Sequence, residues 1–555
     1  MALALKILRI LAFLLPVLTF APFVRANPRF HVDTTRDAGP VSRNLFGANV
    51  EYVGEDTPAA RAVMNGTTLA RFPGGDDVSR FLWSDPSIGT CTQPRWNWDA
   101  IATYAREHGM AFFLESNVVL GNAQSTAQWV SDARARGIEV PYLDVGNEVW
   151  GSWDAGYRTT AQYEQDVRAT AAAVRAVSPE TKIVLEVGTF NEDAWNRDAV
   201  RRLADVVDAI DYHYYPNHLS TAEPMSVTAG ADGVKPLVNR LRAMLRDVAP
   251  ARADALEILI GEYDGASDPI RGQAPVPGRV YLQWAMPNAL FYGAAIGEMM
   301  EAGVSAATFY ELQGYRFGAI NGGACTPENT AIRRPKELVL RLWREHFGTR
   351  MLNVDALEVP TFHSDGPTNW DGFAGEAPFV RAYASLADGG ESVRLMITNR
   401  HADEAFDTQW TLDGFDPETT AATWQVAGDS MLATNENVGG PVDAVRTVSG
   451  SVAIAGSSFV FRAPPHSVTA LVLRRRGATT VPSESIAAVQ TPRSVVTSIG
   501  DGGGQDAGAR DTGYEPPPHA TASCSAARPG GADAVALPLV MGALVGLVVA
   551  VKKRK

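Results

Sequence analysis

Short runs of apolar, often β-branched residues alternate with amphipathic stretches over the first two thirds of the chain. The apolar runs are typical of buried parallel strands, and the stretches between them, such as 161–177 and 236–248, are typical of the helices that connect such strands. The pattern predicts eight strands, at roughly 45–52, 68–72, 111–115, 142–145, 182–187, 209–214, 257–261 and 306–310. Eight strand–helix units over about 300 residues predict an α/β fold, a (β/α)8 TIM barrel at 41–347.

The pattern changes after Trp343, where short alternating strands with Gly, Asp and Pro turns replace the strand–helix rhythm. Such alternation predicts a C-terminal all-β sandwich domain at 348–476. The segment 27–40 contains a strand that precedes the first barrel strand and has no place in the barrel. We expect this strand to join the β-sandwich.

The two ends of the chain have the features of targeting segments. Residues 1–26 combine Lys6 and Arg9 with a following apolar run, which predicts a signal peptide, with an uncleaved anchor as the alternative. Residues 534–551 are apolar and uncharged and precede the basic stop 552–555, which predicts a transmembrane or sorting helix. The segment 477–533, rich in Gly, Ser, Thr, Ala and Pro, is predicted to be a disordered stalk.

Taken together, these ends predict an exported protein held at the cell surface by its C-terminal helix, whether that anchor is retained or clipped. With Cys524 ahead of the helix, the tail resembles the short C-terminal sorting tails of myxobacterial and related surface proteins. Cys524 is then either a processing point or an incidental cysteine in the stalk.

Charge and cysteine content narrow the possible partners. The chain has 62 acidic and 49 basic residues and a formal net charge of −13, so we expect no nucleic-acid partner. No His or Cys residues have zinc-site spacing, so we expect no metal and no other cofactor. Cys91 and Cys325 form either a disulfide across the rim of the barrel or two free thiols.

Polar side chains gather where the predicted barrel strands end, which is where TIM barrels build their active sites. Glu148 and Glu262 each follow an apolar strand directly, on strands four and seven, which face each other across the barrel. A carboxylate pair about 5 Å apart is what retaining glycoside hydrolysis requires. The alternative is that both are surface acids of an acidic protein.

The triplet Gly146, Asn147 and Glu148, with a lone Glu at strand seven, resembles clan A of the retaining glycoside hydrolases. Three further stretches, 44–47 leading to Glu51, 71–76 and 213–215, resemble the α-L-arabinofuranosidases of family 51. This resemblance covers about residues 29–473 and implies a TIM barrel with a trailing β-sandwich. It also implies that Glu148 is the acid/base and Glu262 the nucleophile.

The same resemblance implies a set of sugar contacts. They are Asn147 to the 2-hydroxyl, Glu51 and Gln313 to the sugar, and His213 and Tyr214 beside the nucleophile. Two departures leave the specificity open. Asp76 stands where family 51 usually has Asn, and the residues around Glu262 resemble the heparanase-like family 79, so β-glucuronidase and β-xylosidase activities are alternatives.

Several tryptophans follow the strand ends, among them Trp150, and flat rings there are able to stack on sugar faces or to pack in the core. We predict a secreted, surface-anchored retaining glycoside hydrolase, most similar to an α-L-arabinofuranosidase, acting on an oligo- or polysaccharide. The rival interpretation is a non-catalytic carbohydrate-binding surface protein.

Overall fold

The structure is a computed structural model that describes residues 27–50, 66–85, 98–217, 223–267, 280–314, 316–321, 332–366, 372–436 and 443–479. The predictions for residues 1–26, Glu51, Cys91, Cys325 and residues 480–555 lie outside these ranges. The chain divides into two units, 1–493 and 494–555, and only the first contains described residues. Within the described ranges, no helix is long and apolar enough to span a membrane.

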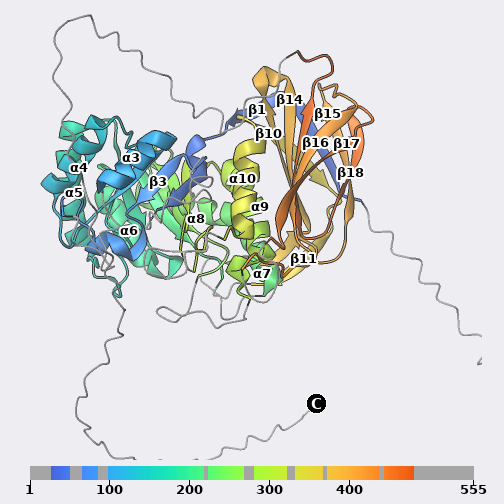
Figure 1. The fold of residues 1–555 in the computed structure, drawn as a ribbon. Helices are drawn as coiled ribbons and strands as arrows, with labels where there is room; N and C mark the ends of the chain where they lie inside the picture. Colours follow the sequence, from blue (N-terminus) through green and yellow to red (C-terminus); the bar gives the residue numbers. More distant parts are fainter. Residues whose placement is uncertain are drawn as a thin grey trace, which may run out of the picture. The chain divides into compact units, whose positions relative to one another are not determined.

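Eight parallel strands close into a barrel, and this confirms the predicted TIM barrel (Figure 1). The strands are β2 (Gly47–Asn49), β3 (Leu69–Phe72), β4 (Ala111–Ser116), β5 (Tyr142–Val145), β6 (Lys182–Val187), β7 (Ala209–Tyr214), β8 (Glu257–Tyr263) and β9 (Ala306–Phe309). The helices that follow the strands include α3 (Trp98–His108), α4 (Ala123–Ala135), α5 (Thr160–Val177), α6 (Asp193–Leu203), α7 (Pro224–Ala229), α8 (Val234–Val248), α9 (Met286–Ala302) and α10 (Pro335–His346).

Local sequence explains where these helices begin and which side they bury. Helix α5 begins at a capping box, in which Thr159 and Gln162 satisfy each other's free backbone N–H groups. Its buried residues include Val167, Ala171 and Val174, which recur at helical spacing and face the barrel. The helix therefore gains its stability from one apolar side.

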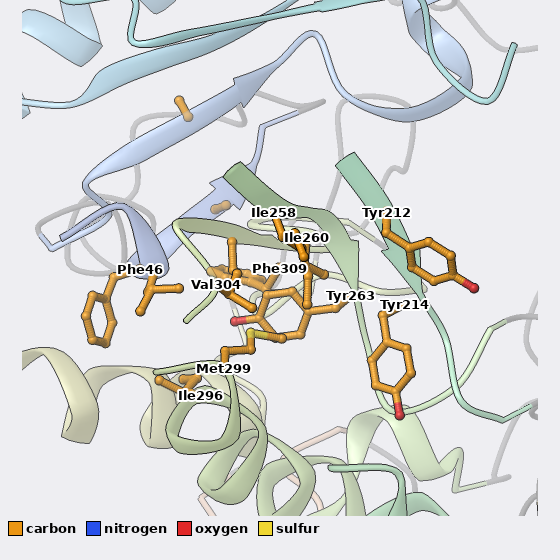
Figure 2. Close-up of a cluster of buried hydrophobic side chains, with 14 of the residues drawn as sticks. Phe46, Tyr212, Tyr214, Ile258, Ile260, Tyr263, Ile296, Met299, Val304 and Phe309 are labelled. Carbon is orange, nitrogen blue, oxygen red and sulfur yellow. The ribbon is translucent and has the colours of Figure 1, made fainter. Parts of the chain in front are cut away.

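Helix α9 differs because it is buried along nearly its whole length. Toward the barrel, Ile296 and Met299 lie against the outward-facing side chains of β8, including Tyr263 (Figure 2). On another side of α9, a methyl group at Gly297 would lie 2.4 Å from the ring of Tyr383, in the C-terminal β-domain. Only glycine allows this close approach, so α9 is packed between the barrel and the β-domain.

The β-domain contains one nine-stranded sheet in the order β17-β16-β19-β14-β13-β10-β1-β15-β18 and a two-stranded sheet of β11 and β12. The bounds are β1 (Arg29–Pro40), β10 (Arg350–Leu357), β11 (Thr361–Asp365), β12 (Ala374–Pro378), β13 (Val380–Ala387), β14 (Ser392–Asn399), β15 (Phe406–Asp413), β16 (Thr420–Ala427), β17 (Arg446–Ala453), β18 (Ser458–Ala463) and β19 (Ser467–Arg474). Strands β14 and β18 share one apolar core although β13, β10, β1 and β15 separate them in the order. The two layers of the predicted sandwich are thus halves of one curled sheet.

Strand β1, from the N-terminal end of the described chain, lies inside this sheet. It pairs antiparallel with β10 and parallel with β15. Phe30 and Val32 on β1 are buried in the core of the sheet, and Phe30 stacks on Trp410. The β-domain is therefore built from segments on both sides of the barrel sequence.

Candidate active site

The inside of the barrel changes character along its axis. Its lower half is filled by apolar side chains, which include Leu69, Phe113, Val184 and Leu259. Toward the carboxyl ends of the strands, the buried side chains become polar, and they include Arg71, Glu115, Asp144, Glu186 and Asp211. The candidate site lies above this polar layer, at the face where TIM barrels carry their chemistry.

Glu148 and Glu262 come together at this face, on either side of His213. The His213 Nδ1 atom lies 3.2 Å from Glu148 Oε1 and 3.6 Å from Glu262 Oε2. One oxygen of each carboxyl group and one ring nitrogen all lie within 4.8 Å of one another. The Glu262 side chain is 7% exposed and that of Glu148 is 16% exposed, so both have limited access to solvent.

Glu262 is held by two donors. Arg71 Nη1 donates to Glu262 Oε1 at 2.8 Å, and the Tyr215 hydroxyl donates to Glu262 Oε2 at 2.8 Å. These bonds fix the plane of the carboxylate and stabilise its negative charge. Tyr215 itself packs edge-on against Tyr310 and Phe317, which limits the movement of its ring.

Arg71 organises the site around its guanidinium, which is fully buried. Its Nη1 also donates to Asn49, and its Nη2 donates to Asn147 Oδ1 at 3.1 Å. The bond to Oδ1 orients the Asn147 amide and leaves its nitrogen as the group that is able to donate to a ligand. Burial opposes the charge of Arg71, but Glu115, Glu262 and the other nearby carboxylates raise its pKa.

Glu115 is the second ion-pair partner of Arg71, with Oε1 at 2.6 Å from Nη2. Its Oε2 accepts the backbone N–H of Gly74 at 2.7 Å, in the loop that follows β3. Burial raises the pKa of Glu115 to about 7, although Arg71 acts in the opposite direction. The desolvation of this carboxyl group thus outweighs its ion pair.

Asp76, Gln313 and Trp150, the other predicted substrate contacts, lie in three different loops. Asp76 lies half-buried in the 3-10 turn Gly75–Arg80, two residues after Gly74. Gln313 is buried in the loop after β9, and its backbone forms an isolated parallel β-bridge with that of Ile320. Trp150 is 5% exposed and its indole N–H donates to Glu186, so its ring is mainly buried.

The prediction that Tyr214 contacts the substrate is wrong, because alternation along β7 turns its side chain out of the barrel. Its hydroxyl donates to the Gly230 carbonyl, and its ring lies against Phe291 of α9. Figure 2 shows Tyr212 and Tyr214 projecting from the ribbon among the buried apolar side chains. The inward positions on this strand are Asp211 and His213, and Tyr215 just beyond the strand takes the place expected for Tyr214.

The sequence prediction also missed Arg71, Glu115 and Glu186 as parts of the site. The signal that could have identified them is the period of two along each strand, since each lies at an inward position near the carboxyl end of its strand. Charged residues inside a strand that is otherwise apolar are the exception that needs an explanation.

Within the described ranges, Glu148, His213 and Glu262 form the one group of three acidic, His or Cys side chains spaced closely enough to hold a metal ion. The geometry around them fits a cation poorly, because Arg71 already places a positive charge 2.8 Å from Glu262 Oε1. We therefore describe this group as a carboxylate pair with an interposed histidine.

No protein-family model matches the chain. The intracellular exo-α-(1→5)-L-arabinofuranosidase of Streptomyces lividans is 28% identical over 251 residues, which cover 34% of this chain and 37% of that protein. α-L-Arabinofuranosidase C of Emericella nidulans is 20% identical over 446 residues, 73% of this chain and 85% of that protein. The chain spans 37% and 46% of the lengths of the S. lividans enzyme and an exo-α-(1→6)-L-arabinofuranosidase of Bifidobacterium longum.

Solved structures give the same likeness over more of the chain. The α-L-arabinofuranosidase of Thermotoga maritima superposes with a TM-score of 0.68 at 19% identity, covering 80% of this chain and 100% of that one. The family 51 α-L-arabinofuranosidase of Thermotoga petrophila has a TM-score of 0.68 at 18% identity, covering 80% of this chain and 99% of that one. These comparisons confirm the predicted resemblance to family 51, and at this identity the structural likeness establishes the fold.

Proposed function

We propose that this protein is a retaining glycoside hydrolase of the α-L-arabinofuranosidase type, with Glu148 as the acid/base and Glu262 as the nucleophile. The observation that carries the proposal is the proximity of the two carboxyl groups, since one oxygen of each lies within 4.8 Å of the other and both groups lie near His213 Nδ1. Retaining enzymes have carboxyl groups about 5–5.5 Å apart, whereas inverting enzymes need about 6.5–9.5 Å to admit a water molecule.

The two environments suit two different roles. Glu262, fixed by Arg71 and Tyr215, attacks the anomeric carbon while Glu148 gives its proton to the departing glycosidic oxygen. Glu148, now ionised, then removes a proton from a water molecule that attacks the same carbon and releases Glu262. The Asn147 amide nitrogen donates to a sugar hydroxyl, because Arg71 already occupies its oxygen.

The names of the similar proteins, all arabinofuranosidases, support an α-L-arabinofuranoside as the sugar that is cleaved. We also propose Glu51 and Gln313 as sugar contacts, and export to the cell surface by way of the N- and C-terminal segments. The substrate is then an extracellular oligo- or polysaccharide that carries arabinofuranosyl groups.

The test is hydrolysis of p-nitrophenyl α-L-arabinofuranoside, β-D-xyloside, β-D-glucuronide and β-D-glucoside by the purified protein. We expect turnover of the arabinofuranoside and its loss in Glu262→Ala. Glu148→Ala should keep activity on glycosides with good leaving groups, because those need little protonation. Unchanged turnover in Glu262→Ala would refute the nucleophile assignment. Turnover of another glycoside in the panel would replace the arabinofuranoside as the proposed substrate. No turnover of any of the four would favour a non-catalytic carbohydrate-binding protein.

A further inference from the structure

Glu148 has an unusual backbone conformation for a residue with a side chain. Its φ angle is 43°, in the left-handed region, two residues after Gly146 at φ 95°. A residue other than glycine held there is strained, and the conformation persists only where its surroundings fix it. The conformation turns the Glu148 side chain toward His213 and Glu262 at the end of β5.

Glu186 supplies the contact that fixes this turn. Both of its carboxyl oxygens accept the backbone N–H of Glu148 at 2.8 Å, and Oε1 also accepts the indole N–H of Trp150 at 3.2 Å. Glu186 projects from β6, the strand next to β5, and its side chain is fully buried. Because Glu186 is shielded from solvent, water does not readily take its place.

We propose that Glu186 is a positioning residue for the acid/base step, in which its carboxyl group accepts the backbone N–H of Glu148 and so keeps the Glu148 side chain directed at the leaving oxygen. This inference rests on the acid/base role proposed above. It assigns to Glu186 no contact with the substrate. The role requires that residue 186 places an acceptor oxygen within hydrogen-bonding distance of the Glu148 backbone N–H, and this is called its reach below.

The charge of Glu186 is secondary in this arrangement. Burial raises the pKa of Glu186 to about 8, although His213 and Arg71 act in the opposite direction. Burial thus favours the uncharged carboxyl group, which Gln resembles in shape and in its acceptor oxygen. Two conservative variants separate reach from charge. Glu186→Gln keeps the reach and removes the charge, while Glu186→Asp keeps the acid and withdraws it by one carbon–carbon bond, about 1.5 Å.

The experiment measures kcat/KM of the full chain and of both variants on aryl α-L-arabinofuranosides, from phenyl to 2,4-dinitrophenyl. For Glu186→Asp we expect a loss of about 10- to 100-fold on the phenyl glycoside and of less than about 3-fold on the dinitrophenyl glycoside, because only the first needs the acid. Glu186→Gln should follow the wild-type profile. Glu298→Asp makes the same shortening at a buried carboxyl group of α9 that accepts from the Tyr383 hydroxyl, and this matched control should not change the slope against leaving group.

Equal losses on all leaving groups in Glu186→Asp, or no loss, would overturn the proposal. A leaving-group-dependent loss in Glu186→Gln would also overturn it, because the acid/base step would then depend on the charge of Glu186 and not on its reach. Glu186→Gln therefore tests the proposal even if Glu186→Asp does not fold. Failure of the wild type to hydrolyse any member of the series would instead contradict the proposed function. A wild type that is active, and whose dependence on the leaving group becomes steeper in Glu148→Ala, would leave only the role of Glu186 at issue.

Discussion

Replacing Glu115 by Gln should remove part of the pH dependence of the protein's stability. Glu115 is fully buried between Arg71 and the backbone N–H of Gly74. Burial raises its pKa from the ordinary value of 4.5 to about 7. A carboxyl group whose pKa is higher in the folded than in the unfolded protein stabilises the fold at low pH, and this contribution is lost as the pH rises from the unfolded value through the folded one.

The magnitude follows from these two values. At about 1.4 kcal/mol per pH unit, a change from 4.5 to about 7 corresponds to about 3 kcal/mol of unfolding free energy. Gln does not titrate, so the variant lacks this contribution at every pH. The unfolding free energy of the wild type, minus that of Glu115→Gln, should fall by about 3 kcal/mol between about pH 4 and about pH 8.

Urea unfolding followed by tryptophan fluorescence, at a series of pH values in this window, measures the difference directly. Glu180→Gln is a suitable control, because that carboxylate is 58% exposed in a surface ion pair and tests the loss of a negative charge alone. Parallel curves for the wild type and Glu115→Gln would refute the reasoning. A difference that grows with pH would mean that the ion pair with Arg71 outweighs the burial of Glu115.

Two further variants test other parts of the structure. Arg400→Met removes the fully buried one of the two arginines that pair with Asp232 between the barrel and the β-domain, together with its bonds to the Pro378 and Thr228 carbonyls. We expect it to lower the unfolding free energy by about 3–5 kcal/mol in denaturant titrations, against less than about 1 kcal/mol for the same change at the exposed Arg462. Tyr215→Phe removes one hydrogen bond to Glu262, and kcat/KM should fall by about 10- to 100-fold on good and poor leaving groups alike. A loss confined to poor leaving groups would contradict the assignment of Tyr215 to the nucleophile.

The strand and helix pattern was enough to predict the barrel, because parallel strands buried on both sides leave continuous apolar runs in the sequence. It was also enough to place Glu148 and Glu262 at strand ends. The curled single sheet of the β-domain was not predictable in this way. Local alternation shows that a strand has a buried face, but it does not show that β14 and β18 close over one core.

The site residues that were missed have a common physical cause. Tyr214 and Tyr215 are adjacent and chemically identical, and only the pleat of β7 decides which of them reaches Glu262. The bond from Glu148 to Glu186 joins a backbone N–H to a side chain 38 residues away. No motif records such a bond, because the backbone N–H is the same for every residue except proline.

The polar layer inside the barrel serves function more than stability. The lower half of the barrel shows which side chains stability alone favours. There, apolar side chains such as Leu69 and Phe113 fill the interior, as is usual in TIM barrels. Nearer the carboxyl ends of the strands, Glu115 and other carboxyl groups are buried at a free-energy cost that Arg71 offsets only in part. What the layer provides is rigidity, because Arg71 fixes the plane of one carboxyl group of the pair and Glu186 fixes the backbone of the other. A carboxyl pair with oxygens held within 4.8 Å of one another, one on β8 and one in the turn after β5, suits double displacement.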